Sequence, residues 1–384
     1  MAIHYRPTIA EIDLHAFRSN FLEIKKLLGE SPLPEGISPM AIVKANAYGH
    51  GAVRCTRTLE ELGVRQFGVA TVEEGVELRD AGIRADIVIL DGLLTDSLQV
   101  FLDYRLKPVL HQLEDVSRWG SFLHGKVKEG PAHIKLDTGM GRLGFLPSQT
   151  DALVELLKKY SEILVQGVFT HLAQADEEEG APTERQFVLF ERMQQILESK
   201  LTQLKGSKTV YAIANSAALI DNRLSGYSLV RPGIILYGAY PNPRHREKIS
   251  LKPVMKLKTA LCGVKQFPSG SALGYGGTFV TKRESRIGIL PIGYADGYPR
   301  LVSNKGSVLV RGKRAPVVGR ISMDLTLVDV TDIPECVMGD EVVLIGSQGE
   351  DWLRAEEVAG WADTISYEIF CGVSARVPRV YVGI

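Results

Sequence analysis

Short runs of apolar residues alternate with longer amphipathic segments between residues 40 and 236. Continuously apolar runs are typical of parallel strands buried on both faces, and the segments between them have helical periodicity. Eight such units over about 240 residues favour a (β/α)8 TIM-type barrel over an open doubly wound sheet. The predicted strands are Met40–Val43, Gln66–Ala70, Asp86–Leu90, Pro108–His111, Ala132–Leu136, Val165–Thr170, Thr209–Ala214 and Leu229–Leu236.

Helix signals support this pattern. An amphipathic helix is predicted over Leu14–Leu28, and another from about Thr183 to Lys200. After the second strand, Thr71 and Glu74 have the spacing of a capping box, which marks a helix N-terminus.

The pattern of predicted elements changes near residue 245. Beyond it, valine-rich segments separated by Gly and Pro predict a mainly β domain, interrupted by a helix over Arg354–Trp361. We therefore expect a (β/α)8 barrel over residues 13–245 and a mainly β C-terminal domain over 246–384, with an N-terminal strand in residues 1–12 that pairs with the β domain. The predicted β segments are Val254–Phe267, Arg286–Ile292, Ser307–Val318, Leu325–Val330 and Glu341–Ile345.

Charge and cysteine content exclude several classes of protein. Lys+Arg and Asp+Glu both number 45, so there is no excess positive charge to indicate a nucleic-acid or membrane partner. The four cysteines have no metal-ligand spacing, and no metal site is predicted. Scattered thiols and the lack of an apolar leader favour a cytoplasmic protein.

Met40-Ala41-Ile42-Val43 is a short apolar strand that ends at Lys44. One interpretation is a lysine that forms a Schiff base; the other is a lysine at a strand end that extends to solvent. The residues that follow, Asn46 to Gly51, indicate a tight turn.

Polar residues also follow the other predicted strands, at the end of a barrel where active sites lie. The loops after strands seven and eight contain Ser216 and Gly233–Ile234, which suit a phosphate site of the kind these barrels carry. A phosphate site, a reactive lysine and the strand-end Arg231 together suggest pyridoxal phosphate. No Gly-x-Gly-x-x-Gly or Walker pattern follows the first strand.

The segment Val43-Lys44-Ala45-Asn46-Ala47-Tyr48-Gly49-His50-Gly51 resembles the cofactor-lysine signature of alanine racemases. The resemblance covers essentially the whole chain and overturns the solvent-exposed interpretation of Lys44. It continues through Lys135-Leu136-Asp137-Thr138-Gly139-Met140-Gly141-Arg142, Ala214-Asn215-Ser216-Ala217-Ala218, Arg231-Pro232-Gly233-Ile234, Gly293-Tyr294-Ala295-Asp296-Gly297-Tyr298 and Gly319-Arg320-Ile321-Ser322-Met323-Asp324.

The resemblance implies a pyridoxal-phosphate-dependent isomerase that interconverts L-alanine and D-alanine by a two-base mechanism and supplies D-alanine for peptidoglycan. Lys44 would bind the cofactor and act as the base toward the D-isomer, and Tyr275 would act toward the L-isomer. His171, tied to Arg231, would hydrogen bond to the phenol of Tyr275. Arginine stays protonated, so Arg231 would donate to the pyridine nitrogen and keep that nitrogen unprotonated.

The resemblance also implies the remaining site residues. Arg142 and the Met323 amide would bind the substrate carboxylate, and Lys135 matches a lysine that is carbamylated in the family. Tyr275 and Met323 lie in the β domain, and the family meets this by a head-to-tail dimer, so the resemblance implies a homodimer with shared active sites. The cofactor would be held by Lys44, Tyr48, His171, Asn215, Ser216, Arg231, Gly233, Ile234 and Tyr367.

Alternatives remain. A broad-specificity amino-acid racemase would share this fold, and a non-catalytic pyridoxal-phosphate-binding protein would share the barrel. The β domain with Tyr275 argues against the non-catalytic protein. Arg231 argues against a barrel decarboxylase, which would need an acidic partner for the ring nitrogen. A metal-dependent hydrolase would need a His-x-His pair on the first strand, and the sequence has none.

Overall fold

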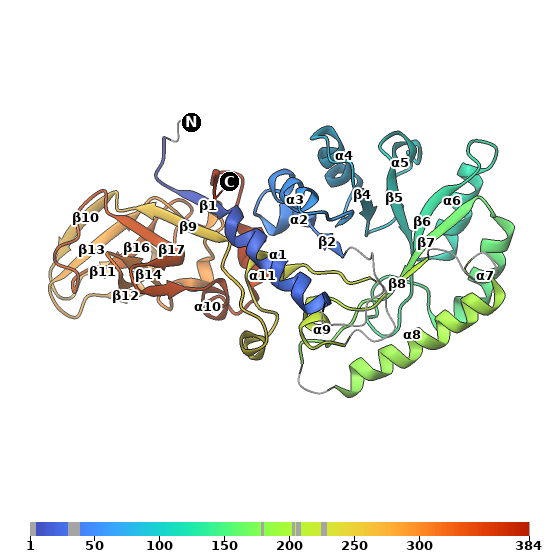
Figure 1. Cartoon of the computed structure of the whole chain (residues 1–384). Coiled ribbons are helices and arrows are strands. Elements are labelled where there is room, and N and C mark those ends of the chain that lie inside the picture. The colour runs from blue at the N-terminus through green and yellow to red at the C-terminus, as the bar shows by residue number, and fades with distance from the viewer. Residues whose placement is uncertain are drawn as a thin grey trace.

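A computed structural model of the chain describes residues 5–29, 39–177, 180–201, 204, 209–223 and 229–383. Figure 1 shows an α/β lobe, with helices outside a curled sheet, beside a smaller lobe built mainly of strands. A continuous cluster of buried apolar side chains extends through both lobes, so they share a core. The expected fold class, a barrel followed by a mainly β domain, is confirmed.

The curled sheet contains parallel strands in chain order. They are short and largely buried, as expected for strands covered on both faces. Side chains that point inside the barrel at its C-terminal end, such as Ile42, Leu90, Lys135 and Phe169, line one cavity. The strands are β2 (Met40–Ile42), β3 (Gln66–Val69), β4 (Asp86–Ile89), β5 (Leu106–Leu110), β6 (Gly130–Lys135), β7 (Ile163–Phe169) and β8 (Val210–Ala212).

The predicted eighth strand, Leu229–Leu236, is only partly formed, which corrects the prediction. Its first residues lie between β2 and β8: Met40 N donates to Val230 O at 3.0 Å, Ile42 N donates to Pro232 O at 2.9 Å, and a parallel bridge reaches β8. Pro232 has no N–H to continue a ladder, and the chain turns into the 3-10 helix η3 (Ile234–Tyr237). An extended segment rather than a regular strand therefore closes the ring.

Helices follow the strands and cover the outside of the sheet (Figure 1). The capping box predicted at Thr71 and Glu74 is present at the start of the helix after β3. The helices of this lobe are α1 (Leu14–Gly29), α2 (Lys44–Tyr48), α3 (Ala52–Glu61), α4 (Val72–Asp80), α5 (Gln99–Asp103), α6 (Leu113–Leu123), α7 (Thr150–Lys159), α8 (Ala181–Lys200) and α9 (Ser216–Ile220).

The β lobe contains a larger mixed sheet, a three-stranded sheet of order β10-β13-β16 and the hairpin β11–β12. The larger sheet has the order β15-β14-β17-β9-β1-β19, with β18 paired to β17. The elements are β1 (Ile9–Asp13), β9 (Met255–Ala260), β10 (Gly263–Phe267), β11 (Ala272–Leu273), β12 (Phe279–Val280), β13 (Ser285–Leu290), β14 (Ser307–Val310), β15 (Lys313–Pro316), β16 (Thr326–Asp329), β17 (Glu341–Gln348), β18 (Asp351–Leu353), α10 (Ala355–Trp361), α11 (Ser366–Gly372) and β19 (Arg379–Val382).

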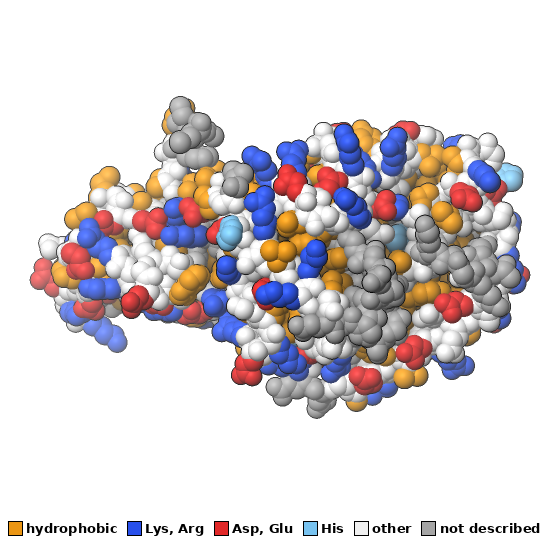
Figure 2. Space-filling model, viewed as in Figure 1, with side chains coloured by type: hydrophobic (Ala, Val, Ile, Leu, Met, Phe, Trp, Pro, Cys, Tyr) orange, Lys and Arg blue, Asp and Glu red, His pale blue; other side chains and the backbone are white. Residues whose placement is uncertain are grey.

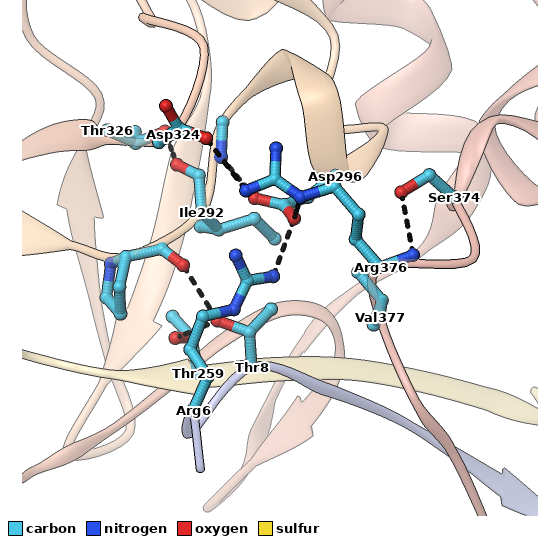
Figure 3. A network of polar contacts seen from close by, with 12 residues as sticks. Arg6, Thr8, Thr259, Ile292, Asp296, Asp324, Thr326, Ser374, Arg376 and Val377 are labelled. Carbon is cyan, nitrogen blue, oxygen red and sulfur yellow. Dashed lines mark hydrogen bonds and ion pairs between the residues drawn. The ribbon is translucent and has the colours of Figure 1, made fainter. Parts of the chain in front are cut away.

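The N-terminal strand β1 belongs to the β lobe, where it lies between β9 and β19. Ahead of it, Arg6 donates to the buried carboxylate of Asp296 at 2.5 Å, and the hydroxyls of Thr8 and Thr259 lie 2.8 Å apart (Figure 3). Arg376 approaches the same Asp296 oxygen at 3.5 Å. These contacts fix the segment that leads into β1, while residues 1–4 of the predicted N-terminal strand lie outside the described residues.

On the face shown in Figure 2, acidic and basic side chains are interspersed over both lobes, in keeping with their equal numbers in the sequence. Among the described residues, none of the helices combines the length and apolar character needed to cross a bilayer.

Candidate active site

A cavity of about 820 Å³ opens at the C-terminal ends of the barrel strands. This is the end where barrels place their chemistry, because the loops after the strands converge there. The predicted site residues in its wall are Lys44, Tyr48, Lys135, Arg142, His171, Asn215, Ser216, Arg231, Gly233, Ile234 and Tyr367. The structure thus brings together residues separated by more than 300 positions in the sequence.

Lys44 begins a turn with an unusual backbone. The next residues, Ala45 to Tyr48, have φ angles between 51° and 54°, in the left-handed region. For residues other than glycine this region costs roughly 1–2 kcal/mol each. Hydrogen bonds hold the turn: Ala47 N donates to Val43 O at 2.8 Å, and Gly49 N donates to Ala45 O at 2.9 Å. We call residues 45–48 the left-handed turn; it presents both Lys44 and Tyr48 to the cavity.

A small polar cradle on the cavity wall is formed by Tyr48, Ser216, Gly233 and Tyr367. Ser216 Oγ accepts a hydrogen bond from Gly233 N at 2.9 Å. A Cβ atom at Gly233 would lie 2.7 Å from the Tyr48 hydroxyl, so only glycine leaves this space open. Burial raises the pKa of both tyrosines, which keeps their hydroxyls protonated as hydrogen-bond donors. Such a set of donors suits a phosphate.

Asn215 has a structural task at this edge of the cavity. Its side-chain oxygen accepts from Ala218 N at 3.1 Å and caps the short helix α9, which places Ser216 at the helix start. Ile234 likewise begins η3, immediately after the glycine of the cradle.

Arg231 is buried on the cavity wall. Its Nη2 atom donates to the carbonyl oxygens of Thr170 at 2.5 Å and Ile213 at 3.3 Å, and its guanidinium lies over the ring of Phe169. Its Nη1 atom is buried and has no hydrogen-bond partner among the described residues. Burial lowers the pKa of Arg231 to about 10, so it remains a cation at neutral pH.

His171 follows Thr170 directly and also faces the cavity. Burial, and then the positive charge of Arg231, lower the pKa of His171 to about 3, so its imidazole is neutral. Arg231 donates to the carbonyl oxygen of Thr170, the residue directly before His171. The expected tie between the His171 and Arg231 side chains stays a prediction. Gln186 Nε2 donates to His171 O at 3.0 Å and steadies the same loop.

Lys135 ends β6 inside the cavity. Burial, followed by the guanidinium groups of Arg142 and Arg231, lowers its pKa to about 8. The carboxylate of Asp91, on the same wall, acts in the opposite direction. The Lys135 amine is therefore far more often neutral than a lysine in water.

Arg142 is carried by a loop that one carboxylate organises. Asp137 Oδ1 accepts from the backbone N–H groups of Gly139, Met140 and Gly141 at 2.9–3.1 Å, and Oδ2 accepts from Arg142 N at 3.1 Å. These four backbone hydrogen bonds to one carboxylate hold the loop together.

Two predicted residues lie away from the cavity. Tyr275 is 70% exposed between β11 and β12, in the β lobe, and Met323 is 53% exposed in a loop of the same lobe. Neither lines the cavity formed by the described residues. The hairpin β11–β12 lies at the end of the molecule remote from the barrel strands (Figure 1). Asp324, next to Met323, is paired with Arg376 at 2.8 Å (Figure 3).

Sequence reasoning missed several residues of the site. Asp137 was predicted only as part of the motif from Lys135 to Arg142, although an Asp that begins a glycine-rich loop is a sign of a loop anchor. Gln186 and Asp91 carried no local signal, because their roles depend on contacts across the barrel. Glu74 was identified as a capping residue, but its contact with the Lys44 segment was not foreseen.

Comparisons with known proteins agree over the whole chain. Residues 12–241 match the family described as alanine racemase, N-terminal domain, and residues 254–381 match alanine racemase, C-terminal domain. The chain is 43% identical over 378 residues to alanine racemase of Halothermothrix orenii, covering 98% of this chain and 97% of that protein.

Solved structures are also similar along the whole chain. One is alanine racemase from Bacillus anthracis with bound L-Ala-P, with a TM-score of 0.88 and 33% identity over 100% of this chain and 97% of that one. Another is alanine racemase from Bartonella henselae with covalently bound pyridoxal phosphate. Its TM-score is 0.86, and it is 30% identical over 98% of this chain and 99% of that one.

Proposed function

The chain belongs to the alanine racemase family, and we propose that it interconverts L-alanine and D-alanine with pyridoxal phosphate as its cofactor. The observation that carries this proposal is the content of one cavity. It holds the Lys44 amine, the phosphate cradle and Arg231, whose buried Nη1 has no partner among the described residues.

The residues present fit the cofactor. Tyr48, Ser216, Gly233 and Tyr367 would hold its phosphate, with the Ile234 amide beside them. Arg231 Nη1 would donate to the pyridine nitrogen, which would satisfy the buried donor. When bound, pyridoxal phosphate links covalently to an amine and makes the α-proton of an attached amino acid acidic.

The residues of the chain then handle the proton. Lys44 would take or return the α-proton on the face of the D-isomer, and Tyr275 would do so on the opposite face. Arg142 would bind the substrate carboxylate from the loop that Asp137 organises, and the Met323 amide would reach it from the β lobe. Because Arg231 is fixed as a cation, it would keep the ring nitrogen unprotonated and favour simple return of the proton over other reactions.

We infer a homodimer with shared sites, because the cavity formed by the described residues lacks the second base. Tyr275 is exposed in the β lobe and remote from its own cavity, so a second copy would have to supply it. Mixing inactive Lys44→Ala and Tyr275→Ala chains should restore about a quarter of the wild-type activity, since half of the randomly formed dimers have one intact site. No recovery after verified subunit exchange would reject shared sites.

The cysteines bear on the compartment in which the enzyme works. We propose that the enzyme works in the cytoplasm and supplies D-alanine for peptidoglycan. The four cysteines are free thiols, two of them exposed, as is usual in a reducing compartment.

Two measurements test the proposed function. Racemisation is assayed with L-alanine and a panel of other L-amino acids, and alanine should be the preferred substrate. Borohydride reduction of the cofactor-loaded protein, followed by peptide mapping, should place the label on Lys44. Label on another lysine, or no turnover of alanine by the loaded enzyme, would refute the assignment.

A further inference from the structure

We propose that Glu74 and Arg379 are positioning residues that hold the two ends of the left-handed turn and so aim Lys44 and Tyr48 at the cofactor. Neither residue lines the cavity, and neither would touch the substrate. The role rests on the proposed function only in that Lys44 is taken as the cofactor lysine.

Glu74 holds the first residue of the turn. Its Oε1 atom accepts from Ala45 N at 2.6 Å, the amide that follows Lys44 directly. Its Oε2 atom accepts from Ala70 N at 2.7 Å and Thr71 N at 3.4 Å. Both oxygens are therefore engaged, and the carboxylate ties the Lys44 segment to the loop between β3 and α4.

Arg379 holds the residue at the other end. Its Nε atom donates to Gly49 O at 2.9 Å, directly after the turn. Its terminal nitrogens donate to the carbonyl oxygens of Ser374, Val377 and Val373 at 2.5–2.8 Å, which lie just beyond α11. Arg379 stands on β19 of the β lobe, so it joins the turn to the helix that carries Tyr367.

The charges suit the backbone that they contact. In a helical turn of either hand the free N–H groups lie at the start and the free carbonyl groups at the end, so a carboxylate at the start and a guanidinium at the end are both favourable. The turn needs such support, because its four successive residues occupy a region that residues other than glycine seldom adopt.

Packing adds a reason for the turn to keep one position. A Cβ atom at Gly49 would lie 2.2 Å from Phe370 O of α11, so the turn rests directly on that helix. Asn46 Oδ1 also accepts from Ala52 N at 2.7 Å and closes the turn onto α3. Without Glu74 or Arg379 the turn would keep these local contacts but lose its connection to α4 or to β19.

The first test compares Glu74→Ala with Glu73→Ala in the cofactor-free full-length protein. Glu73 lies in the same first turn of α4 but is exposed, so it controls for the loss of a carboxylate there. We expect hydrogen exchange in the peptide that covers residues 44–51 to rise at least tenfold in Glu74→Ala and to stay unchanged in Glu73→Ala. Unchanged exchange in Glu74→Ala would overturn the proposal.

The second test measures pyridoxal phosphate binding by the absorbance of the covalent complex. We expect Glu74→Ala and Arg379→Ala each to weaken binding about tenfold, with Glu73→Ala at the wild-type value. Arg379→Lys should rescue little, because a lysine cannot bond to Gly49 and the three carbonyls together. If Glu74→Ala and Arg379→Ala lower Tm as well as cofactor affinity, and hydrogen exchange rises throughout the chain, the two residues have a general folding role and the proposal is overturned.

The tests distinguish a failure of the proposed function from a failure of the positioning role. If borohydride labels another lysine, the assignment of Lys44 falls, while the exchange result still reports whether Glu74 holds the turn. If Lys44 is labelled and the Glu74→Ala turn exchanges like the wild type, the function stands and the positioning role is rejected.

Discussion

Arg231 donates to the carbonyl oxygen of Thr170 at 2.5 Å, and this bond places its guanidinium on the cavity wall, where Nη1 has no hydrogen-bond partner in the part of the chain that the structure describes. A lysine ends in a single nitrogen, so it could not replace two separate nitrogens, Nη2 bonded to Thr170 and Ile213 and Nη1 directed to a ligand. Since a hydrogen bond to a charged group contributes roughly 1.5–3 kcal/mol, Arg231→Lys should lower racemisation by about 100-fold. Alanine turnover measures the effect, with the exposed Arg192→Lys as control; wild-type activity in Arg231→Lys would contradict this role.

Gly233→Ala tests the cradle. The added methyl group would lie 2.7 Å from the Tyr48 hydroxyl, inside the space assigned to the phosphate. We expect the affinity for pyridoxal phosphate to fall by at least about tenfold, since a steric contact of this size forces neighbouring groups to move. Gly360→Ala is a matched control, because a Cβ atom there has nothing within 4 Å. Binding followed by absorbance decides the outcome, and equal affinities in the two variants would argue against the cradle.

Tyr275→Ala should separate the two directions of the reaction. If Tyr275 handles the proton on one face only, exchange of the α-hydrogen of L-alanine with solvent is abolished, while some exchange with D-alanine remains through Lys44. The exposure of Tyr275 means that the substitution removes few contacts within its own chain. Isotope exchange followed by NMR gives both rates, and equal loss with both isomers would rule out separate bases.

Lys135 should take up carbon dioxide. Carbamylation needs the neutral amine, and with the pKa lowered to about 8, half of the Lys135 side chains are neutral at that pH, against less than about 1% for an ordinary lysine. Incorporation of ¹³C-bicarbonate, observed by NMR, should increase from pH 7 to pH 8 and disappear in Lys135→Arg. We also expect Lys135→Ala to raise the KM for alanine, because Arg142 loses an orienting partner. A wild-type enzyme without the ¹³C signal would refute carbamylation.

His133 should make the protein sensitive to acid. It is fully buried in the barrel, neither ring nitrogen has a partner among the described residues, and burial followed by the charge of Lys107 lowers its pKa to about 3. Below pH 6.5 the unfolded chain binds a proton that the folded chain does not, so stability falls with pH down to about pH 3. Each pH unit in that window costs about 1.4 kcal/mol.

Urea unfolding of the cofactor-free protein measures this effect. Between pH 7 and pH 5, His133→Leu should lose about 2 kcal/mol less stability than the wild type. The exposed His124→Gln variant should follow the wild type closely. Identical pH dependence in His133→Leu and the wild type would show that this imidazole does not titrate as its burial implies.

Much of this protein is determined locally by the sequence. Apolar runs and capping signals predicted the strands at Gln66 and Asp86 and the helix after Thr71, because burial on two faces and helix capping depend on neighbouring residues. The residues around Lys44 by themselves left two interpretations open, and the chemistry was implied by the resemblance of Val43–Gly51 to the cofactor-lysine signature of alanine racemases. The eighth strand was overestimated, because the periodicity of Leu229–Leu236 does not reveal where the chain leaves the ring after Pro232.

Only the tertiary structure decided how these residues act together. The left-handed turn is unfavourable in isolation and is bonded to Glu74 and Arg379, which come from two lobes. Burial by strands distant in sequence makes the imidazole of His171 neutral and leaves Arg231 Nη1 without a hydrogen-bond partner among the described residues. Hydrogen bonds and desolvation depend on distance in space rather than along the chain. Only the folded protein therefore shows which groups line the cavity and that Tyr275 is not among the described residues that line it.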